Sequence, residues 1–341
     1  KEKVHDYMSE HSTQDKTELA KKAADTYQNI ISQVAKVIVG QEQVVEQSLI
    51  ALFAQGHCIF VGVPGLAKTL LVSTTAKALG LDFNRIQFTP DLMPSDITGT
   101  DILREDPQTG ERRFEFLQGP IFTNLLLADE LNRTPPKTQA ALLQAMQERE
   151  VTASGRTYQL DQPFLVFATQ NPVEQEGTYQ LPEAQLDRFM LMIQVGYPSL
   201  ADELEVVKRT TRPQNVNIES ALSQAELIIY QGLVRELPAA DEVVSYAVRL
   251  TRATRPDDPL ATEQVNRLVR WGAGPRAGQS LILAAKARAL LNGRLHASRA
   301  DIKSLAPAVL THRVLTNYQA EAEGISASDI VSQLIEELQR G

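Results

Sequence analysis

The chain has 341 residues, a net charge of −8 at pH 7 and a hydrophobic share of 43%, which suits a globular protein of one large or two smaller domains. The acidic balance argues against a protein that follows a nucleic-acid backbone, and no apolar stretch reaches the ~18 residues that a membrane span needs. The single cysteine, Cys58, excludes a disulfide within the chain, and we expect a cytoplasmic protein because the start is polar and carries no apolar leader.

Three regions of different character divide the chain. Residues 1–29 are charged and contain no proline or glycine, so we expect a helical or disordered extension. Residues 30–212 alternate strand-like and helical patterns, and residues 213–341 are helical. This division predicts an extension, an α/β core and an all-α domain.

The core region contains short apolar runs of strand length, separated by helical patterns. The runs are residues 58–61, 83–88, 125–128, 164–169 and 191–195. Strands that alternate with helices predict a parallel sheet with helices on both faces.

Two segments of the core region predict β-hairpins instead. In residues 101–118, turn residues at 106–110 lie between two strand-like flanks. In residues 149–160, Ser154-Gly155 lies between two short β-prone runs.

After Pro198 the pattern is wholly helical. Ser298 and Asp301 have the spacing of a capping box at the start of a helix. One face of the helix expected at residues 241–251 carries Val244, Ala247, Val248 and Thr251.

A glycine-rich segment, Gly62-Val63-Pro64-Gly65-Leu66-Ala67-Lys68-Thr69, follows a strand and leads through Leu70 into a helix, which is the context of a phosphate-binding loop. Backbone N–H groups of the loop and of the helix start would surround the phosphates of ATP. Lys68 would reach the β- and γ-phosphates, and the Thr69 hydroxyl would hold Mg²⁺. The strict pattern has glycine in place of Ala67, and alanine fits there if its φ is negative.

Two carboxylates end the strand at residues 125–128, and an asparagine follows the next strand. Asp129 suits Mg²⁺, bound through water, and Glu130 suits polarising the water that attacks the phosphate. The pair could also be a plain helix cap, but the phosphate-binding loop upstream favours the catalytic interpretation. Asn171 could orient water near the γ-phosphate; the alternative is an ordinary turn asparagine before Pro172.

These three motifs resemble Walker A, Walker B and sensor 1 of the AAA+ superfamily. The segments at 88–99 (FTPDLMPSDITG) and 129–139 (DELNRTPPKTQ) closely resemble signatures of the MoxR family, in which the Ala67 variant of the loop is itself familiar. The resemblance extends from about Ile38 to the C-terminus. It implies a P-loop NTPase core of the AAA+ type followed by an all-α lid.

Further site residues follow from the resemblance alone. Gly40 and Gln41 lie in a segment that resembles the lining of the adenine pocket. The segment at 181–189 (LPEAQLDRF) resembles the arginine-finger segment, which makes Arg188 the candidate finger on a neighbouring subunit.

The resemblance also assigns the helical domain and the hairpins. Residues 274–277 (GPRA) resemble sensor 2, with Arg276 at the edge of the lid over the γ-phosphate, although the common form has serine in place of Gly274. Without the motifs, both arginines would be interpreted as surface ion-pair residues. The two hairpin segments resemble the helix-2 insert and the pre-sensor-1 insert of this clade.

The function implied by the resemblance is that of a chaperone-like ATPase that uses ATP and Mg²⁺. We expect a homo-oligomer, a hexameric ring, that works with a von Willebrand factor A domain protein and a client protein complex. A nucleic-acid motor is a second possibility, against which the acidic charge and the lack of a basic–aromatic array count. A non-hydrolysing, nucleotide-gated scaffold is a third, against which the retained catalytic residues count.

Overall fold

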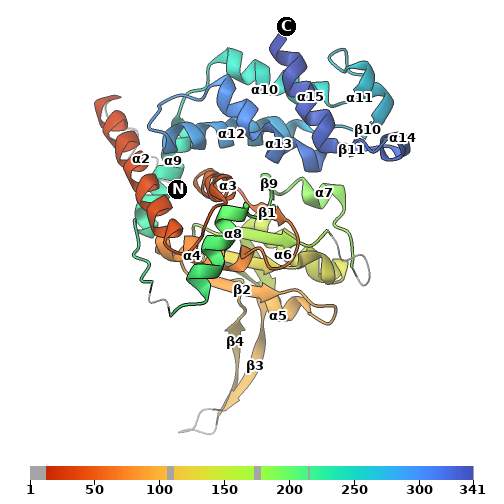
Figure 1. Ribbon diagram of the computed structural model, residues 1–341. Coiled ribbons are helices and arrows are strands. Elements are labelled where there is room, and N and C mark those ends of the chain that lie inside the picture. Colours follow the sequence, from red (N-terminus) through yellow and green to blue (C-terminus); the bar gives the residue numbers. More distant parts are fainter. Residues whose placement is uncertain (1–12, 106–110, 173–177, 214–215, 341) are drawn as a thin grey trace.

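The computed structural model describes residues 13–105, 111–172, 178–213 and 216–340, and it shows an α/β core joined to a helical lid (Figure 1). The turn expected at residues 106–110 lies outside the described residues. Within the described part, no helix is long and apolar enough to cross a membrane.

The centre of the core is a parallel sheet of five strands in the order β2, β5, β8, β1, β9. The strands are β1 (Cys58–Val61), β2 (Phe83–Gln87), β5 (Leu125–Asp129), β8 (Leu165–Gln170) and β9 (Leu191–Gln194). They correspond to the five apolar runs, with small differences at the ends, so the parallel sheet expected from the sequence is confirmed. Because the strands are parallel, their carboxyl ends meet at one edge of the sheet.

Helices cover both faces of this sheet. The helices of the core region are α2 (Thr13–Ala35), α3 (Glu42–Phe53), α4 (Lys68–Ala78), α5 (Pro94–Thr98), α6 (Pro136–Glu148), α7 (Glu183–Leu186) and α8 (Leu200–Thr210), of which the last two have no buried residue. Alternate strand residues point to opposite faces. Cys58 and Phe60 join the buried cluster that contains α2, α3 and α4, whereas Ile59 joins a second cluster that contains α6. Cys58 is fully buried.

Helix α2 runs across residue 30, where the sequence had suggested a boundary. Its buried residues Ala23, Tyr27 and Ile30 belong to the main hydrophobic cluster. The helix packs against α4 of the core and against α12 (Pro275–Leu291) of the lid. It therefore helps to fix the lid on the core.

The two hairpins expected from the sequence form. One consists of β3 (Gly99–Glu105) and β4 (Arg112–Gln118) and projects away from the sheet (Figure 1). The other consists of β6 (Glu150–Ala153) and β7 (Arg156–Gln159). Phe116 of β4 stacks on Tyr158 of β7, with ring centroids 4.1 Å apart and an interplanar angle of 11°. This stack joins the base of the longer hairpin to the shorter one.

The lid is helical, apart from a short ribbon that the sequence did not indicate. Its helices are α9 (Gln224–Glu236), α10 (Asp241–Ala253), α11 (Glu263–Leu268), α12, α13 (Arg299–Leu310), α14 (Tyr318–Ala322) and α15 (Ala327–Arg340). The antiparallel ribbon joins β10 (Val269–Trp271) to β11 (Leu315–Thr316), and each strand is too short to give an alternating pattern.

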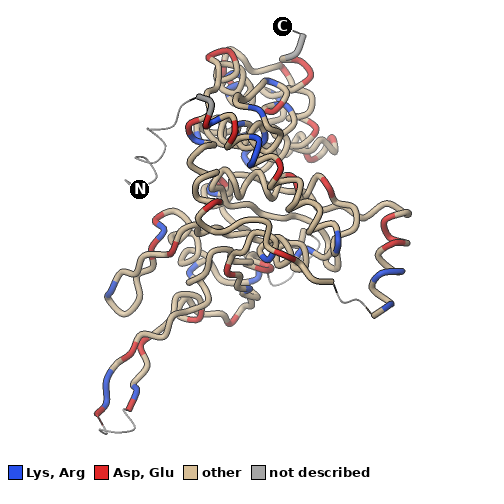
Figure 2. Tube along the Cα trace, turned by 90° about the vertical axis from the view of Figure 1, so that its left-hand side faces the viewer, with Lys and Arg blue, Asp and Glu red and all other residues tan. Residues whose placement is uncertain are grey.

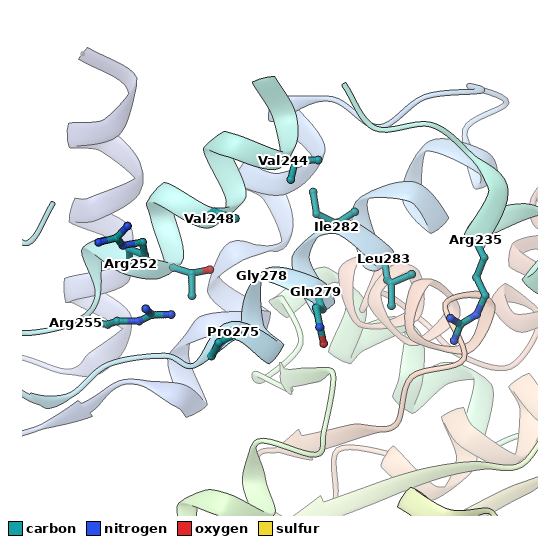
Figure 3. Close-up of a pocket in the computed structure, with 11 residues that line it drawn as sticks. Arg235, Val244, Val248, Arg252, Arg255, Pro275, Gly278, Gln279, Ile282 and Leu283 are labelled. Carbon is teal, nitrogen blue, oxygen red and sulfur yellow. The ribbon is translucent and has the colours of Figure 1, made fainter. Parts of the chain in front are cut away.

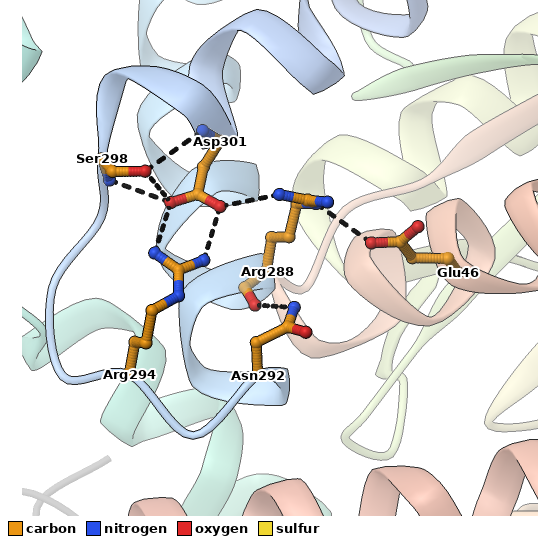
Figure 4. A network of polar contacts seen from close by, with 6 residues as sticks. All are labelled: Glu46, Arg288, Asn292, Arg294, Ser298 and Asp301. Atoms are coloured by element: carbon orange, nitrogen blue, oxygen red, sulfur yellow. Dashed lines mark hydrogen bonds and ion pairs between the residues drawn. The ribbon is translucent and has the colours of Figure 1, made fainter.

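A buried carboxylate organises the interior of the lid (Figure 4). The expected capping box at Ser298 and Asp301 is present, and Asp301 is also fully buried and accepts hydrogen bonds from Arg288 and Arg294. Burial alone would raise the pKa of Asp301, but these arginines and Ser298 outweigh it and lower the pKa to about 2. Arg288 also bonds Glu46 of α3 at 3.0 Å, which ties the lid to the core.

Helix α10 differs from its expected packing. Ala247 and Thr251 are buried, but Val244 and Val248, assigned to the same face, remain 38% and 46% exposed. The buried face is rotated toward Val243 and Leu250, so an apolar edge of the helix remains open.

Candidate functional site

The phosphate-binding loop joins the carboxyl end of β1 to the start of α4. Lys68 donates from Nζ to the carbonyl oxygen of Gly62 at 2.6 Å, so its ammonium group lies back across the loop. Burial lowers the pKa of Lys68, and the nearby Asp129 and Glu130 partly oppose that change. Gly65 has a φ of +83° and open space where a Cβ would lie. The loop therefore offers backbone and a cation to a phosphate, and ATP fits this donor set.

Ala67 does not have the negative φ that would make alanine easy to accommodate at this position. Its φ is +55°, in the left-handed region, and it lies immediately before α4. The loop turns sharply there to begin the helix, which explains why glycine occupies this position in the strict pattern. For alanine the conformation costs about 1–2 kcal/mol.

Thr69 and Asp129 provide the ligand types that Mg²⁺ prefers. The Thr69 hydroxyl donates to Oδ2 of Asp129 at 3.3 Å, and Oδ1 of the same carboxylate accepts from Thr169 at 2.6 Å. Over the described residues there is no group of three or more His, Cys, Asp or Glu that could hold a metal alone. A magnesium ion would therefore need phosphate oxygens or water to complete its coordination.

Arg85 on β2 was not identified from the sequence. Both Nε and an Nη of Arg85 donate to Oδ2 of Asp129, at 3.0 and 2.6 Å. Strands β2 and β5 are neighbours with Gln87 opposite Asp129, which places Arg85 and Gln87 on the same side as the carboxylates. The positive charge of Arg85 lies against an oxygen that would bind the metal. Its position in an ordinary strand pattern gave no local signal of this role.

Glu130 is held by polar contacts from three elements. Its carboxylate accepts from Gln87 at 2.8 Å and from Arg133 at 2.9 Å, and its backbone N–H donates to Thr169 at 2.8 Å. Its φ of +57° is left-handed, as is found for strained residues at functional sites. Thr169 contacts both Asp129 and Glu130, and no sequence pattern marked it for this role.

Asn171 and the segment around Gln41 both lie next to the loop. Asn171 follows β8, whose last residue Gln170 pairs with Val61 immediately before the loop, and its side chain is almost fully buried. Gln41 donates from Nε2 to the carbonyl of Leu66 at 3.4 Å. Both expected groups therefore lie beside the phosphate-binding loop. Gly40 and Gln41 have left-handed φ angles of 65° and 60°.

Arg188 and Arg276 are not at this edge of the sheet. Arg188 precedes β9 and donates to the carbonyl of Leu143 at 2.7 Å, while Arg276 forms an ion pair with Asp187 at 3.0 Å. Strand β9 is parallel to β1, with Leu191 opposite Cys58, so the residues before β9 lie at the amino edge. The phosphate-binding loop lies at the carboxyl edge. Arg276 therefore lies away from the phosphate-binding loop of its own chain, and its role over a γ-phosphate stays a prediction.

Arg313 explains why the lid docks at this amino edge. Its side chain is 2% exposed, and Nε donates to Oδ1 of Asp187 at 2.8 Å. The remaining guanidinium N–H groups donate to the carbonyls of Asp187, Phe189, Val309 and Met190. No motif marks Arg313 in the sequence, because its partner Asp187 lies more than a hundred residues away.

Comparison with known proteins supports an ATPase core followed by a lid domain. Residues 57–191 match a model of the ATPase family associated with various cellular activities (AAA), and residues 261–334 match an AAA lid domain. The chain is 44% identical to Chaperone MoxR1 of Mycobacterium tuberculosis over 313 residues, 91% of this chain and 81% of the relative. It is 33% identical to Protein MoxR of Methylorubrum extorquens, over 83% of this chain and 85% of the relative. A crystal structure of a protein from Cytophaga hutchinsonii superposes with a TM-score of 0.87 at 43% identity, covering 94% of this chain and 96% of that one.

Proposed function

Because the chain belongs to the MoxR family of AAA+ ATPases, we propose that it hydrolyses ATP to ADP and phosphate in a site shared by two copies. A site shared by two copies is supported by one observation: the two arginines expected to act on the γ-phosphate lie far from the phosphate-binding loop of their own chain. Arg188 and Arg276 lie at the amino edge of the sheet, whereas Lys68 lies at the carboxyl edge. A neighbouring copy would supply the arginines to each loop.

The residues of the carboxyl edge have separate tasks in this proposal. The backbone from Gly62 to Leu70 and the ammonium group of Lys68 bind the phosphates of ATP. Thr69 and Asp129 hold Mg²⁺, which when bound neutralises charge on the phosphate oxygens. Glu130 polarises the attacking water, and its contacts with Gln87 and Arg133 orient the carboxylate. Asn171 positions that water from the next strand.

The two arginines complete the site from the neighbour. A guanidinium group close to the γ-phosphate stabilises the charge that develops there during transfer. Since the donating and accepting surfaces differ, the contact between copies is head-to-tail, and such contacts close into a ring when the rotation allows it. We propose a hexameric ring on the resemblance to the AAA+ superfamily.

The first test replaces Glu130 with glutamine. The variant Glu130→Gln keeps the size of the side chain but removes the charge that polarises water, so ATP binding should persist while turnover falls at least ~100-fold. Lys68→Ala should weaken nucleotide binding itself, measured by titration with a fluorescent ATP analogue. Near-normal turnover by Glu130→Gln would overturn the role assigned to this carboxylate.

The second test asks whether the arginines act between copies. Arg188→Ala and Arg276→Ala should each bind ATP and hydrolyse it poorly. Each arginine variant should regain activity when it is mixed with Glu130→Gln. In a mixed ring, the arginine variant keeps an intact Glu130 in its own site, and the neighbouring Glu130→Gln copy supplies both arginines to that site. No recovery in rings shown to contain both variants would mean that these arginines act in their own chain or only support the structure.

The cellular role of ATP hydrolysis is proposed from the names of the relatives. One relative is named a chaperone, and this supports a chain that remodels or activates a protein complex in the cytoplasm, together with a von Willebrand factor A domain protein. Along the described trace, lysine and arginine alternate with aspartate and glutamate (Figure 2), and the net charge is −8. This charge distribution favours a protein client over a nucleic acid. Stimulation of the ATPase by DNA or RNA would contradict that choice.

A further inference from the structure

Gln139 lies near the start of α6 and is fully buried, although its side chain is polar. Its amide nitrogen Nε2 donates to three backbone carbonyls, those of Leu131 at 3.3 Å, Thr134 at 3.0 Å and Tyr179 at 3.3 Å. An NH2 group has two N–H bonds, so at least one of them is shared between two carbonyls. The opposite orientation of the amide would place its oxygen against the same carbonyls, so the three acceptors fix which end of the amide faces them.

The three carbonyls belong to two segments of the core. The first two lie in the turn after Glu130, and Arg133 of this turn donates to the Glu130 carboxylate at 2.9 Å. The third carbonyl belongs to Tyr179, which lies ahead of Arg188 in the chain. The backbone N–H of Tyr179 also donates to the carbonyl of Asn132, in the same turn, at 2.7 Å. The buried amide therefore joins the turn after the carboxylate to the segment that leads to the candidate finger.

Arg188 itself is attached to the same helix. Its guanidinium group donates to the carbonyl of Leu143 at 2.7 Å. Gln139 and Leu143 are four residues apart, so they lie on one face of α6, separated by about 6 Å along its axis. One helix thus supports both the turn after Glu130 and the side chain of Arg188.

Arg276, the other arginine proposed for the neighbouring copy, reaches this segment from the lid. It lies in the first turn of α12, and Pro275 before it lines a cavity of about 790 Å³ between α10 and α12 (Figure 3). Arg252 and Arg255 at that end of the cavity already have partners in the lid, an aspartate at 2.9 Å and a backbone carbonyl at 2.8 Å. The support of Arg276 is therefore the lid, and the support of Arg188 is α6.

The polar groups around Gln139 are not arranged for stability alone. Oε1 of Gln139, Oδ1 of Asn132 and Oγ1 of Thr134 are buried and have no hydrogen-bond partner among the residues that the structure describes. A buried acceptor without a partner lowers the stability of a fold. An apolar side chain of similar size at position 139 would avoid that penalty for its own oxygen. The benefit of the amide therefore lies in the two segments that it holds together.

We propose that Gln139 positions Glu130 and Arg188 together, so that the hydrolysis site of one copy and the arginine that it offers to the next copy share one support. A shift of the turn moves Arg133 and the carboxylate that it orients, and the same shift moves Tyr179 and the segment before Arg188. Gln139 is fully buried and acts through these other groups, so it is a positioning residue and not a catalytic one. The part that concerns Arg188 rests on the proposed function, in which this arginine acts between copies.

The first test replaces the amide with a thioether of similar size. Gln139→Met should lower kcat at least ~10-fold, because a displacement of about 1 Å at a reacting group costs up to roughly 100-fold in rate. Affinity for a fluorescent ATP analogue should stay within about threefold of wild type, since the phosphate-binding loop is untouched. Gln144→Met is the matched control: Gln144 is exposed on the same helix and bonds Glu148, so this variant should change neither quantity. If Gln139→Met fails to bind nucleotide, Gln139→Asn, which keeps the amide on a shorter side chain, takes its place with the same expectation. An unchanged kcat would overturn the inference.

Mixed rings measure the effect on the neighbouring copy. In the reference mixture of Arg188→Ala with Glu130→Gln, the second variant is inactive and contributes its arginines alone. Adding Gln139→Met to the Glu130→Gln copy should lower the recovered activity at least about fivefold, whereas adding Gln144→Met should leave it unchanged. Equal recovery with and without Gln139→Met would reject this positioning of Arg188 and leave the shared arginines intact. No recovery in the reference mixture would reject the shared arginines, and the coupling to a neighbour with them.

Discussion

Asp187 and Arg276 form an ion pair at 3.0 Å that connects the arginine-finger segment to the first turn of a lid helix. The same carboxylate accepts from buried Arg313 at 2.8 Å. Arg276 is largely exposed and Arg313 is buried, so the two ion pairs of Asp187 contribute differently to the stability of the fold. The pair also fixes Arg276 beside the segment that carries Arg188, and this neighbourhood underlies the proposal that both arginines serve an adjacent copy.

Removing Asp187 should therefore destabilise the fold far more than removing Arg276. Asp187→Ala leaves the 2%-exposed Arg313 without its charge partner and should lower the free energy of unfolding by about 3 kcal/mol. Arg276 is 49% exposed in its pair, so Arg276→Ala should cost less than about 1 kcal/mol. Urea unfolding of both variants checks the difference. Equal losses would mean that Arg313 is held by its backbone acceptors and not by the carboxylate.

The strained loop residue gives a stabilising substitution. Ala67→Gly should raise the free energy of unfolding by about 1 kcal/mol, because glycine adopts the left-handed conformation without the steric cost that alanine carries. Gly324 is a suitable control, since it has a φ of +70° and no atom lies within 4 Å of the position that a Cβ would take. Gly324→Ala should lower stability by a similar amount for the same reason. A loss of stability in Ala67→Gly would show that the methyl group makes contacts worth more than the strain.

Stability should fall with acidification through a buried histidine. His57 accepts from the backbone N–H of Val166 at Nδ1 and contacts the carbonyl of Met146 through Nε2, and burial lowers its pKa to about 4. Between pH 6.5 and about 4 the unfolded chain binds a proton that the folded chain does not, so the stability present above pH 6.5 is lost as pH falls. His57 alone should lower the free energy of unfolding by about 1.4 kcal/mol for each pH unit that the pH falls across that window. Burial lowers the pKa of His312 as well, which acts in the same direction.

Urea unfolding at several pH values in this window measures the slope directly. The variant His57→Gln removes one titrating group. The slope of its unfolding free energy against pH should therefore be smaller than that of the wild type, by the amount that the uptake of one proton contributes. Identical slopes would show that His57 does not titrate differently in the two states.

The carboxyl edge of the sheet could be predicted from the sequence, whereas the docking of the lid could not. Lys68, Asp129 and Asn171 each follow a recognisable strand, and a parallel sheet necessarily gathers such positions at one edge. The position of Arg276 depends instead on Asp187 and Arg313, which are distant in sequence and carry no local pattern. The roles of these residues in hydrolysis stay predictions.

Backbone conformation was less accessible to prediction from the sequence. The condition of a negative φ at Ala67 is not met, because the loop geometry, and not the intrinsic preference of alanine, sets that angle. Similarly, periodicity placed Val244 and Val248 on an apolar face of α10, but it could not show whether another element of the same chain covers that face. These two differences lie at the phosphate-binding loop and on helix α10 of the lid.

We propose that the projecting β3–β4 hairpin contacts the client, apart from the site of hydrolysis. Leu103 and Phe114 are opposite each other in the hairpin and are 56% and 75% exposed. At its base, Phe116 is half-buried and stacks on Tyr158, so motion of the core can be transmitted to the hairpin. An exposed apolar pair on an anchored hairpin suits contact with another protein.

Replacing that pair should separate client binding from hydrolysis. The double substitution Leu103→Ser and Phe114→Ser should cost less than about 1 kcal/mol of stability, because neither side chain is buried. Basal ATPase should remain within about threefold of wild type, whereas capture of proteins from native extract by the Glu130→Gln form should fall sharply. Phe116→Ser is the contrasting variant: it removes the anchor and should lower stability by about 2 kcal/mol. Unchanged capture by the double variant would move the client-binding surface away from this hairpin, and the helical lid would become the better candidate.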